Sequence, residues 1–176
     1  EKVILKQSYQ FGQFMEIFSK YLEKHSNYFA FIKIPPSNKL KAVIVIPCHN
    51  EPNIIVALNS ILHCKKPEFH VEIIVVINSS TNSSVEIKYQ NSISEKEIKK
   101  WMENNNSTEL HTSLIIIEDI PPKTAGVGFA RKTGMDEAIR RFVQANQKSG
   151  IISCFDADSI VEKNYLVELE KLFNLN

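Results

Sequence analysis

The sequence predicts an α/β fold in which a parallel, Rossmann-like sheet carries helices on both faces. Two observations support this prediction: short, continuous β-branched runs recur along the chain, and segments with helical spacing of apolar residues separate them. Strands that are buried on both faces read as continuous apolar runs, and parallel strands need long crossovers, usually helices, between them. We therefore expect right-handed crossovers between neighbouring parallel strands.

The first part of the chain is expected to contain a helix and an extended connector. Residues 8–25 space Phe14, Phe18 and Tyr21 at helical intervals, which predicts an amphipathic helix. Residues 28–34 form an apolar connector that stops at two prolines. We assign residues 1–41 to this helix and connector, packed on the core, and residues 42–176 to the main domain.

Within the main domain, apolar runs predict strands and apolar stripes predict helices. Residues 78–93, rich in Ser and Asn, are expected to form a mobile loop. Ser94 and Glu97 have the spacing of a capping box, so a short helix is expected to begin there. Met135 is expected to face inward from the long helix. The expected strands are residues 42–46, 71–77, 114–117 and 151–155. One helix is expected after each strand, and these helices include residues 54–62, 94–102, 127–147 and 162–173.

Composition excludes several classes of protein. The 176 residues carry a formal net charge of +1, so no strong overall field would attract nucleic acid. The longest apolar runs have the length of strands, so we expect no membrane segment in this chain. Three widely spaced cysteines predict reduced thiols in a cytoplasmic compartment, rather than a disulfide framework or a zinc site.

Two carboxylates follow the last expected strand. Asp156 and Asp158 are two residues apart, so in an extended segment their side chains point to the same side. Adjacent carboxylates repel unless a positive charge lies between them, and a divalent cation that carries a phosphorylated ligand would supply it. The alternative is a solvated acidic turn, with Ser159 and Glu162 forming a capping box for the next helix.

Other polar residues also follow the expected strands. Because the carboxyl ends of parallel strands meet at one edge of the sheet, and ligands of open α/β sheets bind there, we expect these residues to form one site. Besides the two aspartates, the candidates are Pro47, His49, Asn50 and Glu51 after the first strand, Asn78 after the second, and Gly128, Arg131 and Lys132 after the third.

The glycine-rich segment before the long helix suggests phosphate binding. A helix that opens near Gly128 offers free backbone N–H groups to phosphate, and Arg131 and Lys132 could add charge-assisted hydrogen bonds. The alternative is a turn followed by solvated helix charges. A dinucleotide-binding fingerprint is excluded, because Arg131 stands where its third glycine is required and the segment does not follow the first strand.

Four motifs in this order resemble family 2 type glycosyltransferases with the GT-A fold, over about residues 42–173. The segment 43–51 resembles that family's first strand and loop, and the segment 73–80 resembles its second strand and the acidic, serine-ending loop after it. The segment 126–134 resembles the segment that opens the helix before its metal motif. Asp156-Ala157-Asp158 matches the DxD motif itself.

The resemblance implies a nucleotide-sugar-binding domain that uses a UDP- or GDP-sugar. In it, Asp156 and Asp158 would bind Mn²⁺ or Mg²⁺, His49 would pack on the base, and Arg131 or Lys132 would neutralise phosphate. Asn78 stands where the family usually has an acid that reads the base. The chain ends eighteen residues after Asp158, so the acceptor-binding half and the catalytic base are expected to be absent, and the catalytic residue and the acceptor stay unknown.

Two other classes of protein remain open. Residues 155–160 also resemble the nucleophile strand of haloacid-dehalogenase-type phosphatases, although there the motif opens the domain. A non-catalytic nucleotide-binding or interaction module could instead use the aromatic N-terminal helix as a docking face.

Overall fold

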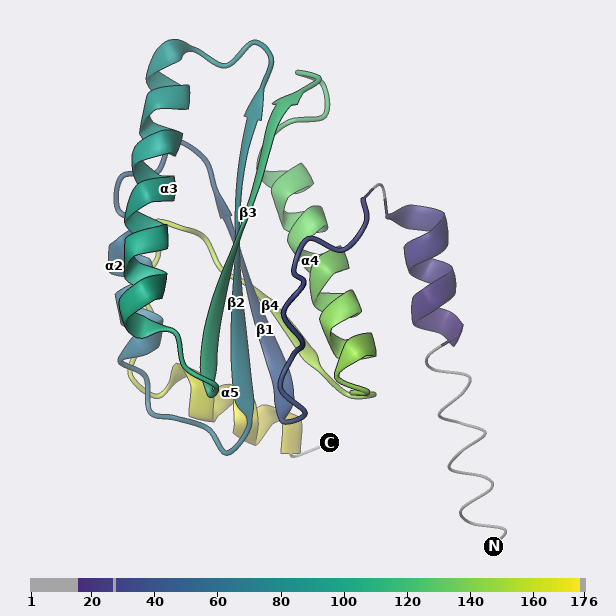
Figure 1. The fold of residues 1–176 in the computed structure, drawn as a ribbon. Coiled ribbons are helices and arrows are strands. Elements are labelled where there is room, and N and C mark those ends of the chain that lie inside the picture. The colour runs from purple at the N-terminus through teal and green to yellow at the C-terminus, as the bar shows by residue number, and fades with distance from the viewer. Residues whose placement is uncertain (1–15, 27, 175–176) are drawn as a thin grey trace, which may run out of the picture.

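The computed structural model describes residues 16–26 and 28–174 and has four parallel strands in the order β3-β2-β1-β4 (Figure 1). This confirms the predicted α/β class. Both neighbours of β1 pair with it in parallel, with Ile44 opposite Ile73 of β2 and Ser153 of β4. The strands are β1 (Leu40–Cys48), β2 (His70–Ser80), β3 (Leu110–Ile120) and β4 (Ile151–Cys154).

Helices cover both faces of the sheet, as predicted. On one face, Ile44 of β1 packs in a core with residues of α2, α3 and α5. On the other face, Val43 of β1 packs in a second core with residues of α4 and Ile32 of the connector. The alternation of neighbouring side chains between two cores explains why β1 reads as a continuous apolar run. The helices are α2 (Ile54–Leu62), α3 (Val85–Asn105), α4 (Val127–Gln144) and α5 (Tyr165–Asn174).

The expected mobile loop over residues 78–93 is wrong. The helix expected at residues 94–102 is present, but it begins earlier, at Val85. Residues 78–80 belong to β2, and α3 runs unbroken from Val85 to Asn105. Ser84 caps this helix, because its hydroxyl accepts a hydrogen bond from the N–H of Ile87. Ser94 lies inside the helix, fully buried, and its hydroxyl donates to the carbonyls of Gln90 and Glu51. Ser94 therefore joins α3 to the loop after β1 and caps nothing.

Smaller differences concern the ends of elements. β3 is longer than expected, α4 ends at Gln144, and Met135 on α4 is exposed. Helix α5 begins at Tyr165, so Ser159 and Glu162 lie before it and do not form its capping box. The expectation of such a cap is therefore wrong.

The connector lies against α4. The buried carboxylate of Glu137 accepts hydrogen bonds from the backbone N–H groups of Phe31 and Ile32, at 3.2 and 2.9 Å. Residues 16–25 form a helix beside α4 (Figure 1), where the hydroxyl of Tyr21 donates to Asp136. Phe14 lies outside the described residues, and the domain division at residue 41 stays a prediction. Among the described residues, no helix combines the length and apolarity needed to cross a membrane.

Candidate functional site

A hollow of about 350 Å³ lies at the carboxyl-terminal edge of the sheet. It contains residues from three of the four segments that were expected to meet there, since β1, the start of α4 and the turn after β4 all contribute. Six of the ten predicted site residues line it. The lining residues are Pro47, His49, Glu51, Val127, Arg131, Asp156, Ala157 and Asp158.

The two aspartates lie in a turn rather than in an extended segment. β4 ends at Cys154, and the N–H of Ser159 donates to the carbonyl of Asp156 at 3.0 Å, which closes the turn. Ala157 is buried in the core between them, while both acids are exposed. The apolar anchor at Ala157 therefore leaves both carboxylates at the rim of the hollow.

Arg131 joins the helix α4 to this turn. Its Nη2 atom lies 2.7 Å from Oδ1 of Asp156, and its Nε atom is buried without a hydrogen-bond partner among the described residues. One turn earlier, α4 begins after Gly126, whose φ of 129° lies in a region that favours glycine. Among the described residues, no side chain caps the first N–H groups of α4. A guanidinium and free N–H groups thus lie on the same side of the hollow, the arrangement that anions require.

The loop after β1 is held by residues of α3. Asn50 has a φ of 52°, and the side chain of Asn91 accepts a hydrogen bond from its N–H at 2.8 Å. Ser94 donates to the carbonyl of Glu51 at 2.8 Å. Asn91 and Ser94 were not among the predicted site residues. Sequence alone gives little sign of these two residues, because a buried polar residue on a helix cannot be distinguished by type from a residue in a loop.

The other predicted residues lie outside the hollow. Asn78 is buried behind it, and Gly128 is exposed at the start of α4 without lining it. The side chain of Asn50 does not line it either. Lys132 points away from the hollow, and its ammonium group donates to Asp136 and to the carbonyl of His25, at 2.7 and 2.8 Å. The structure therefore gives Lys132 no part in this site.

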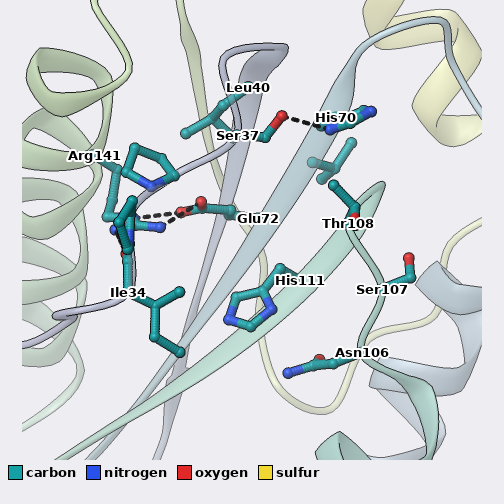
Figure 2. Close-up of a pocket in the computed structure, with 13 residues that line it drawn as sticks. Ile34, Ser37, Leu40, His70, Glu72, Asn106, Ser107, Thr108, His111 and Arg141 are labelled. Carbon is teal, nitrogen blue, oxygen red and sulfur yellow. Dashed lines mark hydrogen bonds and ion pairs between the residues drawn. The ribbon is translucent and has the colours of Figure 1, made fainter.

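A larger hollow, of about 440 Å³, lies at the opposite edge of the sheet (Figure 2). Its wall contains a buried ion pair in which Arg141 donates to both carboxylate oxygens of Glu72, each at 2.7 Å. His70 lies near its rim and is hydrogen-bonded to the hydroxyl of Ser37. These charged groups are already paired with one another and with the connector, so we assign the candidate site to the smaller hollow.

The aspartates offer only part of a metal site. Carboxylate oxygens suit Mg²⁺ and Mn²⁺, and both acids lie at the rim of one hollow. Within residues 16–26 and 28–174, however, no group of three or more His, Cys, Asp or Glu side chains gathers to hold a metal ion. The donor set therefore fits a cation that keeps waters and takes further ligands from a phosphorylated molecule, as Mg²⁺ usually does.

The fold is of the GT-A type. Among solved structures, the chain is similar to S. aureus TarS, a GT-A-type family 2 glycosyltransferase, with a TM-score of 0.51 and 19% identical residues. The match covers 77% of this chain and 33% of that one. TarS in complex with UDP-GlcNAc matches with a TM-score of 0.51 and 20% identity, covering 77% and 32%.

The chain therefore spans about a third of the length of these TarS structures. No family model matches the chain, and no curated protein does. At this level of identity the likeness establishes the fold alone.

Proposed function

We propose that the chain is the donor-binding part of a glycosyltransferase, and that it binds a nucleotide-diphospho-sugar in the hollow at the carboxyl ends of β1 and β4. The observation that carries the proposal is the meeting of Asp156, Asp158 and Arg131 with the open start of α4. The fold supports it, because the neighbour TarS was crystallised with UDP-GlcNAc.

Each side chain has a proposed task. Asp156 and Asp158 hold Mn²⁺ or Mg²⁺, which as a Lewis acid would stabilise the departing nucleotide diphosphate. Arg131 and the free N–H groups of α4 bind phosphate oxygens. His49, whose Nδ1 lies 3.0 Å from the carbonyl of Asn78, is held at the rim, where its ring can pack on the base. The catalytic base and the acceptor site are not assigned to any residue.

Thermal unfolding with UDP or GDP, each with and without Mn²⁺, tests this proposal. At a ligand concentration of 100 times the Kd, binding adds about 2.7 kcal/mol to the free energy of unfolding. For a domain of this size, the Tm should then rise by roughly 5–10 °C. Asp156→Asn and Asp158→Asn should each abolish the part of the rise that depends on Mn²⁺.

Asp119→Asn is the matched control, because Asp119 is an exposed acid at the end of β3 that does not line the hollow. It should leave the rise unchanged. A rise that persists in both aspartate variants of the DxD turn would contradict the metal assignment. If no nucleotide raises the Tm of the unmodified chain, the donor-binding proposal itself is wrong, and trapping of a phospho-aspartate would favour the phosphatase alternative.

A further inference from the structure

Asn78 connects three parts of the candidate site, although it lies behind the hollow. Its backbone carbonyl accepts hydrogen bonds from Nδ1 of His49 and from Nδ2 of Asn91, at 3.0 and 3.1 Å. Its side-chain Nδ2 donates to the carbonyl of Gly126 at 2.8 Å. Only 1% of Asn78 is exposed, so its amide group contacts protein rather than the hollow.

The bond to Gly126 fixes the first peptide plane of α4. The carbonyl of Gly126 and the N–H of Val127 belong to one planar trans peptide and therefore point in opposite directions. Asn78 and the N–H of Ala130, at 3.1 Å, both donate to this carbonyl. Because the carbonyl is held in this way, the N–H of Val127 is directed out of the open end of the helix, beside the hollow that Val127 lines.

The hydrogen bond to the carbonyl of Gly126 requires a donor, which the side-chain amide of Asn78 supplies. An ionised carboxylate at position 78 could not donate a hydrogen bond and would face the Gly126 carbonyl with a second acceptor. The Oδ1 atom of Asn78 is buried and has no partner among the described residues. A buried acceptor without a partner is unfavourable, and the side chain nevertheless keeps its donor on Gly126.

We propose that Asn78 is a positioning residue, which orients the first turn of α4 toward the diphosphate and does not read the base. This inference rests on the proposed function. It predicts that changing Asn78 weakens the binding of every diphosphate to the same extent, whatever base the ligand carries.

Asn78→Asp gives a pH-dependent test, because a neutral carboxylic acid can donate to Gly126 as the amide does. Burial raises the pKa of such a carboxyl above its ordinary value of about 3.9, so the bond is present at low pH and lost as the pH rises through that pKa. Calorimetry with UDP, GDP and inorganic pyrophosphate, each with Mn²⁺, should show binding about fivefold to tenfold weaker than in the unmodified chain at pH 8. The ratio of the variant's Kd to that of the unmodified chain should move toward one as the pH is lowered toward the raised pKa.

Two further variants complete the experiment. Asn82→Asp adds the same charge at an exposed position in the turn after β2 and should leave all three affinities unchanged. Asn78→Ala removes the donor without adding a charge, so it should weaken binding of all three ligands equally at pH 8 and at the lower pH. In this variant the N–H of Ala130 should also exchange its hydrogen faster, because its acceptor on Gly126 is no longer held.

The outcomes separate this inference from the proposed function. A loss confined to UDP or to GDP, with pyrophosphate unaffected, would mean that Asn78 reads the base and would overturn the inference. Unchanged affinities together with unchanged Ala130 exchange would also overturn it. If the unmodified chain binds none of the three ligands, the proposed function fails, while Ala130 exchange still decides whether Asn78 holds the start of α4.

Discussion

His111 lies in the larger hollow, at the amino end of β3, close to the buried ion pair (Figure 2). Burial lowers the pKa of His111 below its ordinary value of 6.5; the nearby carboxylate of Glu72 opposes this shift and the guanidinium of Arg141 adds to it. The unfolded chain therefore binds a proton on this ring at a pH where the folded chain does not.

This difference predicts how stability depends on pH. Above pH 6.5 the ring of His111 does not lower the free energy of unfolding. As the pH decreases from 6.5 toward the lowered pKa, the free energy of unfolding falls, because the unfolded chain binds the proton more tightly. Urea unfolding at pH 5.5 and 7.5 should show that His111→Gln reduces the loss of stability between the two values. His63→Gln, at an exposed imidazole after α2, is the control. An equal loss in the unmodified chain and in His111→Gln would contradict the prediction.

Individual residues show what sequence could reveal about the site. Asp156, Arg131 and His49 were predicted to meet because the carboxyl ends of parallel strands share an edge. Lys132 was misplaced because one residue of a helix turns the side chain by about 100°, so that Arg131 faces the hollow and Lys132 faces away. Asn91 was missed because only tertiary contacts distinguish a buried amide from a loop residue.

At the scale of elements, the strands could be predicted well, and the first half of α3 could not. The strands have long apolar runs, since both faces of the sheet are covered. Helix α3 buries few residues, and its sequence is largely polar, so its periodicity is weak. Ile98 and Trp101 lie in the part of the helix that was predicted, whereas the Ser84 cap and the first turns of α3 lie in the Ser- and Asn-rich segment, which shows no apolar pattern.

The packing of α4 on β1 gives a second prediction. A Cβ atom added at Gly134 would lie 2.4 Å from Cγ1 of Val45 and 3.2 Å from Cγ2 of Val76, so the helix and the sheet would have to separate. Gly134→Ala should lower the free energy of unfolding by about 1–3 kcal/mol, even though alanine favours helix. Gly128→Ala is the matched control, because a Cβ atom there meets nothing within 4 Å.

Urea unfolding of both variants measures this difference. Gly128→Ala should be neutral or slightly stabilising, by less than about 1 kcal/mol. Equal stability of the two variants would show that α4 does not lie as close to β1 as the structure places it.

At the scale of the whole molecule, the Glu72–Arg141 pair joins the sheet to α4 and the connector. Arg141 is 1% exposed and also donates to the carbonyl of Ile34. Glu72→Gln leaves the buried guanidinium without its counter-ion, which should lower the free energy of unfolding by about 3–5 kcal/mol. The double variant Glu72→Leu with Arg141→Met should recover part of this loss, because no unpaired charge stays buried.

Chemical denaturation of these variants provides the measurement. Glu95→Gln on α3 is the control, since it removes an exposed i,i+4 pair with Lys99 and should change stability by less than about 0.5 kcal/mol. A Glu72→Gln variant that is as stable as the Glu95→Gln variant would show that the pair does not hold α4 on the sheet.

Helix α4 is fixed along its whole length, by the Asn78 contact at its start, the Gly134 approach at its middle and Arg141 near its end. These contacts at the start, middle and end of α4 oppose a shift of the helix toward a bound anion. The entropy of ordering this wall of the hollow is lost when the chain folds and not when a ligand arrives, which favours tight binding. Any rearrangement on binding is then expected in the exposed acidic turn at residues 156–158 and not in α4.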